Sequence, residues 1–173
     1  MSIYTESGLT VNLTGYVHHR FQDLQAYKKL SGQHIKEMDF FWLEPVGADQ
    51  PDTDTLIGLE LKGYDQTAFD VEKLLANLLQ KVKDSLAMLH AAWLNTGVGA
   101  TLKQQLPVDY SSYRTQRKIK LIMLINASSA QSSQLSALRA QFKNKVKGIE
   151  NLYGVQTSLV NLSSAQATGL PVS

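Results

Sequence analysis

Cysteine is absent from this chain of 173 residues. Thiolate zinc sites, iron–sulfur clusters and disulfide bonds are therefore excluded, and a metal ion would need oxygen or imidazole ligands. No apolar run is long enough to span a membrane as a helix, and the opening MSIYTESGLT lacks the basic start and hydrophobic core of a signal peptide. We therefore expect an intracellular, cytoplasmic protein that does not contact a membrane.

The chain also lacks a strong excess of charge of either sign. Its formal net charge of +2 permits contact with a polyanion but falls short of the dense Lys/Arg stripe that indicates nucleic-acid binding. The fractions of hydrophobic residues (43%) and charged residues (18%) are those of a globular protein. At this length they predict one domain over residues 1–173 with its own core, and loose termini at residues 1–10 and 163–173.

One stretch, Leu56 to Tyr64 (LIGLELKGY), sets two charged residues in an otherwise apolar run. Its leucine and isoleucine content, with turn-forming residues on both sides, predicts a buried strand. Because side chains alternate between the faces of a strand, Glu60 and Lys62 should project from one face. The apolar residues at 57, 59 and 61 should project from the other face.

A second such strand, Glu37 to Glu44 (EMDFFWLE), places Asp39 among apolar and aromatic residues. Phosphodiester hydrolysis needs a hard divalent cation held by carboxylate oxygens, and a positive group near the attacking water and the phosphate. Asp39, Glu60 and Lys62 supply two carboxylates and one ammonium group. The alternative stays open that Glu60 and Lys62 are an ordinary ion pair on a half-exposed sheet.

Hydrophobic periodicity predicts the remaining elements. The first helix should run from residue 16 to 30, with His18, His19 and Asp23 among the residues of its solvated face. Residues 118–126 form a nearly continuous apolar run, which is typical of a central strand covered on both faces. In chain order we expect helix 16–30, strand 37–44, strand 56–64, helix 67–93, strand 118–126, a helix from about 132, and strand 155–162.

This order of elements, with Asp39 on one strand and Glu60-x-Lys62 on the next, resembles the PD-(D/E)XK nuclease superfamily. The resemblance covers most of the chain and implies an α/β protein with the restriction-endonuclease-like fold, a three-layer α/β/α core around a central mixed sheet. One further early strand would come from residues 9–13 or from part of 33–43. Met38 stands where the family name has proline, a departure that leaves the metal chemistry untouched.

The resemblance implies a metal-dependent nuclease that hydrolyses phosphodiester bonds in nucleic acid, with DNA favoured over RNA. Asp39 and Glu60 would bind Mg²⁺ or Mn²⁺, the backbone carbonyl of Leu61 would complete the site, and Lys62 would orient the attacking water. Some members add a carboxylate from the first helix, where Asp23 is the acidic residue. Endonuclease and exonuclease action both remain open. The resemblance also allows a homodimer, since cutting both strands of a duplex often takes two copies of a small domain.

Five polar residues after the Glu-x-Lys motif are candidates for contact with the substrate. Tyr64 and Gln66 follow closely enough to reach a phosphate or a bound water, although both also suit a turn. Lys73, Gln80 and the neighbouring Lys81 lie on the polar face of the long helix. They can meet a nucleic-acid backbone, although such residues also suit a solvated face.

Two other classes of function stay open. The first is a catalytically inactive nuclease-like subunit that binds nucleic acid or a protein partner, in which Asp39, Glu60 and Lys62 form only a salt-bridged cluster. The second is an unrelated α/β binding protein, since a fold does not fix a function. Binding of a metal ion separates these classes from the nuclease.

Overall fold

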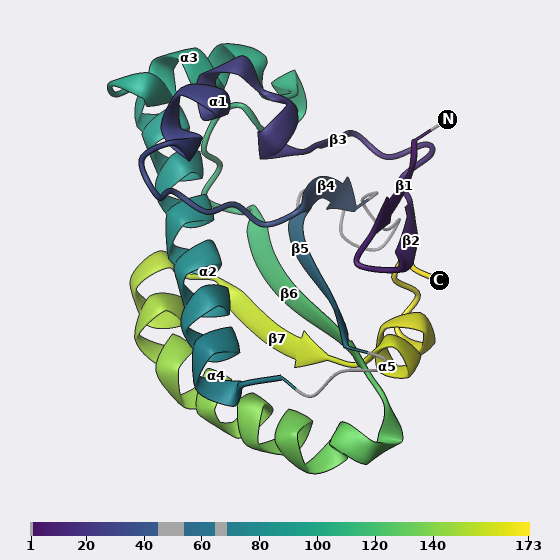
Figure 1. The fold of residues 1–173 in the computed structure, drawn as a ribbon. Coiled ribbons are helices and arrows are strands. Elements are labelled where there is room, and N and C mark those ends of the chain that lie inside the picture. The colour runs from purple at the N-terminus through teal and green to yellow at the C-terminus, as the bar shows by residue number, and fades with distance from the viewer. Residues whose placement is uncertain (1, 45–53, 65–68) are drawn as a thin grey trace.

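The computed structural model describes residues 2–44, 54–64 and 69–173 (Figure 1). These residues form a two-stranded hairpin and a five-stranded mixed sheet with helices packed on it. None of the described helices is both long and apolar enough to cross a membrane. The elements in chain order are β1 (Ile3–Glu6), β2 (Leu9–Asn12), β3 (His18–His19), η1 (Phe21–Asp23), α1 (Gln25–Ser31), β4 (Phe40–Glu44), β5 (Thr55–Tyr64), α2 (Val71–Leu94), α3 (Val98–Gln105), η2 (Val108–Tyr110), β6 (Lys118–Ala127), η3 (Ser129–Gln131), α4 (Ser132–Tyr153), β7 (Gln156–Val160) and α5 (Leu162–Ala167).

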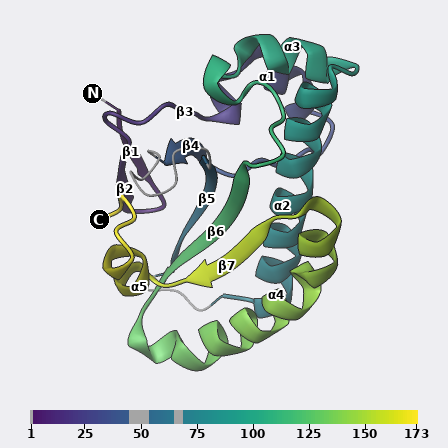
Figure 2. The same ribbon diagram turned by 180° about the vertical axis from the view of Figure 1, so that it is seen from behind.

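The strand order of the sheet explains why its two long helices share a face. The order is β3-β4-β5-β6-β7, with antiparallel pairing from β3 to β5 and parallel pairing from β5 to β7. The two parallel connections contain α2 and α4. Because such crossovers are right-handed, and both step across the sheet in the same direction, both helices pack on the same side. Figures 1 and 2 show α2 and α4 along that side.

A large apolar core fills the space between this face and the helices. Leu78 and Val82 of α2, Leu138 of α4, and Leu121 and Met123 of β6 belong to it, and all five side chains are fully or almost fully buried. Burying side chains of this size contributes roughly 1.5 to 3 kcal/mol each. This core fixes the position of α2 on β5 and β6.

A second core covers the opposite face of the sheet. Phe40 and Leu59 from the sheet pack with Val11 of β2, Ala165 of α5 and Val172 near the C-terminus. The expectation of loose termini is therefore wrong, because the face that α2 and α4 leave uncovered needs an apolar cover. The terminal segments are also tied together through their backbones, since the Thr10 N–H donates to Ser173 at 2.7 Å and the Ser173 N–H donates to Thr10 at 2.9 Å.

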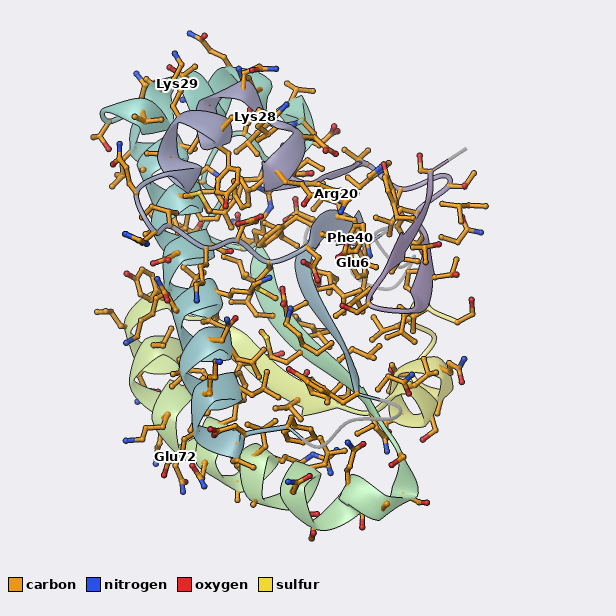
Figure 3. All side chains as sticks on the ribbon, viewed as in Figure 1. Glu6, Arg20, Lys28, Lys29, Phe40 and Glu72 are labelled. Atoms are coloured by element: carbon orange, nitrogen blue, oxygen red, sulfur yellow. The ribbon has the colours of Figure 1, made fainter. Side chains whose placement is uncertain are left out.

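Arg20 joins the hairpin to the sheet. Its guanidinium lies 3.1 Å from the carboxylate of Glu6 in β1 and 4.8 Å from the ring centroid of Phe40 in β4. Figure 3 shows the three side chains together between the hairpin and the sheet. This contact holds β1 close to the start of β4, where Asp39 lies.

The α/β class and the mixed sheet agree with the sequence prediction, as do the positions of β5, β6, α2 and α4. The first predicted helix is wrong over most of its length, because residues 16–30 contain β3 and η1 before α1 begins at Gln25. His18 and His19 pair with Trp42 and Phe41 of β4 instead. Pairing with β4 buries the His19 ring among aromatic side chains. A short isolated helix would leave this ring exposed to solvent.

Candidate active site

Asp39 lies immediately before β4, at the end of its pairing with β5. Phe40, the first residue of β4, pairs with Leu59 of β5. Asp39, one residue earlier, contacts β5 through its side chain. Its Oδ2 accepts a hydrogen bond from the Leu61 backbone N–H at 2.8 Å. This bond aligns the Asp39 carboxylate with the carboxyl-terminal half of β5.

Glu60 and Lys62 project from the helix-covered face of β5, as the alternation of side chains predicts, while Leu59 and Leu61 belong to the core on the opposite face. The Glu60 side chain has no exposed surface, and Lys62 Nζ lies 2.8 Å from its Oε1. Burial of an ionised carboxylate requires such partners. Glu60 and Lys62 are therefore an ion pair on the helix-covered face, in which the carboxylate is fully buried and the lysine side chain is 25% exposed.

Lys81 of α2 brings the two acidic residues together. Its ammonium lies 2.7 Å from the Glu60 carboxylate and 3.5 Å from Oδ1 of Asp39. Both carboxylates therefore converge on one positive centre, the Lys81 ammonium. Lys62 adds a second ammonium group to the cluster. Sequence reasoning assigned Lys81 to a solvated face, yet its spacing from Leu74 and Leu78, seven and three residues earlier, already placed it on the core side of the helix.

The electrostatics of the site follow from its burial. Burial raises the pKa of Glu60 to about 7, and the neighbouring Asp39 carboxylate adds to this, while Lys81 and Lys62 oppose it. Burial alone would lower the pKa of Lys62, but the carboxylates of Glu60 and Asp39 raise it overall. Two carboxylates and two ammonium groups thus form one closely coupled cluster.

The backbone carbonyl of Leu61 has a partner of its own. It accepts a hydrogen bond from the Ser7 hydroxyl, in the turn between β1 and β2, at 3.2 Å. A carbonyl oxygen has two lone pairs, so one acceptor position is left.

A pocket of about 310 Å³ opens beside Lys62, where β5 ends and α2 begins. Clefts at the carboxyl ends of parallel strands are common ligand sites in α/β proteins. Oδ1 of Asn77 is buried without a hydrogen-bond partner in the described structure. The lining residues are Lys62, Tyr64, Phe69, Asp70, Lys73, Leu74 and Asn77.

The structure brings some of the candidate substrate residues to this pocket and not others. Tyr64 and Lys73 line it. Gln80 does not, because its amide donates to the backbone carbonyl of His34 at 2.9 Å. Asp23 lies in η1, directly after the edge strand β3, and among the described contacts none joins its carboxylate to the cluster. Gln66 lies outside the described residues.

Two carboxylates are the acidic part of this cluster. Within residues 2–44, 54–64 and 69–173, no group of three or more His, Cys, Asp or Glu side chains is arranged to hold a metal ion. Comparison with protein-family models, curated proteins and solved structures finds no match for the chain. The function is therefore argued from the geometry of the site.

Proposed function

We propose that the protein is a metal-dependent nuclease that hydrolyses phosphodiester bonds in nucleic acid, DNA rather than RNA. The observation that carries the proposal is the convergence of Asp39 and Glu60 on a single cation, the Lys81 ammonium. Lys62 lies within the same cluster, and its side chain is 25% exposed toward the adjoining pocket. Two carboxylates beside an ammonium and an accessible pocket are the parts that phosphodiester hydrolysis needs.

The donor set fits Mg²⁺ or Mn²⁺. Both ions prefer oxygen ligands and are commonly bound through one or two carboxylates, with water completing the shell. Asp39 and Glu60 would hold the ion, and the free lone pair of the Leu61 carbonyl is a third candidate. When bound, such an ion supplies an activated water and neutralises charge on the phosphate.

The remaining groups of this chain would bind and orient the substrate. Lys62 stands between the acidic pair and the pocket, where its ammonium would offset charge that develops on the phosphate. Lys73 would pair with a neighbouring phosphate, while the buried Asn77 oxygen and the Tyr64 hydroxyl would hydrogen-bond to the sugar or a base. The pocket would thus hold the nucleotide next to the scissile bond.

The arrangement of elements supports a restriction-endonuclease-like fold for this proposal. Asp39 and the Glu60-x-Lys62 strand are neighbours in one mixed sheet, α2 and α4 cover the site face, and β6 runs parallel to β5. On the other face the second layer consists of the β1–β2 hairpin and the short α5. A three-layer α/β/α core would then be reduced on that side to one helix of 6 residues.

A second function is favoured by one observation. Glu60 has no exposed surface and already has two ammonium groups as partners. In this second account the cluster has a purely structural role, which is to join α2 to the sheet. The protein would then be a catalytically inactive nuclease-like subunit that binds nucleic acid or a protein partner.

Cleavage and metal binding, measured on the same set of variants, test the proposal. Wild type should nick or degrade DNA in Mg²⁺ or Mn²⁺, and Lys62→Ala should lower the rate at least about a hundredfold, because electrostatic stabilisation of the transition state is lost. Mn²⁺ affinity should fall in Asp39→Asn and Glu60→Gln but not in Lys62→Ala, which keeps both carboxylates. Lys145→Ala, on the exposed face of α4, is the matched control and should cut at the wild-type rate.

Two results decide against the nuclease. Equal Mn²⁺ affinity in the wild type, Asp39→Asn and Glu60→Gln removes the metal site. Equal cutting by wild type and Lys62→Ala on single-stranded and duplex DNA and RNA identifies the activity as contamination, and the inactive subunit then becomes the better account.

A further inference from the structure

The Lys81 ammonium occupies the place between Asp39 and Glu60 where a divalent cation would bind. We infer that Lys81 is an internal counter-ion that competes with the metal, so that an ion enters only when this side chain leaves. The inference rests on the metal site proposed above. It assigns to a residue of α2 the control of metal affinity.

The distances show why the two cations exclude each other. Lys81 Nζ lies 2.7 Å from the Glu60 carboxylate and 3.5 Å from Asp39. A Mg²⁺ or Mn²⁺ ion bound to these carboxylates would lie about 2.1 Å from their oxygens. The ion and the ammonium would then share the same small space. Two positive centres at such a separation repel strongly in a buried site.

The formal charges point the same way. With both carboxylates ionised, Lys62 and Lys81 balance them. A divalent cation added to this set would leave two uncompensated positive charges in a largely buried place, which is costly. If Lys81 departs, one positive charge remains, and one phosphodiester group of a bound nucleic acid neutralises it.

The Lys81 side chain is also able to move away from the two carboxylates. It is 14% exposed, so part of it lies at the surface, while the Glu60 side chain has no exposed surface. A lysine carries its charge on a flexible four-carbon stem, which lets the ammonium move to solvent without displacement of the helix. Asp39 is exposed to the same degree, so the ion has a path toward the pair.

Mn²⁺ titration of Lys81→Met tests the inference. Methionine keeps much of the length of the side chain and removes the charge. Because the competing cation is gone, the variant should bind Mn²⁺ about tenfold more tightly or better than wild type. Lys83→Met, which removes an exposed lysine from the same helix, should bind as wild type does. Mn²⁺ alone is the probe, so no cleavage activity is required.

The outcomes separate this inference from the proposed function. If the wild type and Lys81→Met bind Mn²⁺ equally tightly and Glu60→Gln binds weakly, the metal site stands and the competition is disproved. If neither binds Mn²⁺ while both remain folded by circular dichroism, the competition and the metal site both fail. Weaker binding by Lys81→Met would mean that Lys81 supports the ion, and this also overturns the inference.

A measurement on the wild type covers the case in which Lys81→Met does not fold. The side-chain NMR signals of Lys81 should move toward those of a solvated lysine when Mg²⁺ is added, with the exposed Lys83 as an internal reference. Signals of Lys81 that stay unchanged at saturating Mg²⁺ would disprove the displacement.

Discussion

His19 lies in the edge strand β3, where an aromatic cluster encloses its imidazole. The ring stacks on Phe41 with a centroid separation of 5.3 Å, and its Nδ1 is 2.7 Å from the hydroxyl of Tyr110. Its Nε2 is buried without a hydrogen-bond partner in the described structure. Burial, with a smaller contribution from the charge of His18, lowers the pKa of His19 from 6.5 to about 3. The folded protein therefore favours the neutral ring.

The pH dependence of stability should reveal this residue. Between pH 6.5 and about 3 the unfolded chain binds a proton at His19 that the folded protein does not, so stability falls as the pH is lowered through this window. From pH 7.5 to pH 5 the wild type should lose about 2 kcal/mol more than His19→Gln, measured by urea unfolding. His34→Gln, which removes an exposed imidazole, should follow the wild type. Parallel curves for wild type and His19→Gln would show that the buried ring titrates normally.

At the scale of the element, α2 organises the candidate site. Besides Lys81, two of its residues hold the segment that leads to Asp39. The Lys36 N–H donates to Asp84 at 2.9 Å, and the Met38 N–H donates to the Ser85 hydroxyl at 2.9 Å. One side of α2 thus holds the backbone just before Asp39. The same side supplies Lys81, the counter-ion of both Asp39 and Glu60.

Loss of the Ser85 hydroxyl should weaken this attachment. Ser85→Ala leaves the buried Met38 N–H without its acceptor, and an unsatisfied buried donor costs about 1 to 3 kcal/mol. Ser136→Ala makes the same change on the exposed face of α4 and should alter the free energy of unfolding by less than about 0.5 kcal/mol. Chemical denaturation measures both. Similar small effects in the two variants would mean that Met38 finds another partner or that its bond contributes little.

The elements that sequence predicted well are those with a long, regular pattern. The apolar face of α2 fits only a helix, and the continuous apolar run of β6 fits a buried central strand. The alternation in β5 correctly put Glu60 and Lys62 on one face. The helix predicted for residues 16–30 failed because its apolar residues recur at helical spacing while pairing with β4 determines the structure of His18 and His19.

The candidate site was predictable only in part for a similar reason. Asp39, Glu60 and Lys62 followed from local patterns on two strands. The spacing of Lys81 from Leu74 and Leu78 places it on the core side of α2. The carboxylates that it meets there lie on other elements, and a single sequence carries no local signal for that pairing.

At the scale of the whole molecule, one sheet separates two cores, and the hairpin connects the second core with the candidate site. The turn of the hairpin lies against the end of β5, where the Ser7 hydroxyl donates to the Leu61 carbonyl at 3.2 Å. Gly63 permits this approach, since a Cβ at this position would lie 2.2 Å from the Ser7 carbonyl oxygen. The terminal segment thereby reaches the strand that carries Glu60 and Lys62.

One substitution made at two glycines tests this connection. Gly63→Ala forces the hairpin turn away from β5, because the contacting atom is backbone and has little freedom to yield, and should destabilise the protein by about 1 to 3 kcal/mol. Gly148→Ala, in α4, meets nothing within 4 Å and should stabilise by up to about 1 kcal/mol, since alanine favours a helix over glycine. Urea unfolding measures both, and opposite signs are the expected result. A stabilising Gly63→Ala would mean that the turn moves freely from the strand, and the hairpin would then have no part in holding Leu61 beside the acidic pair.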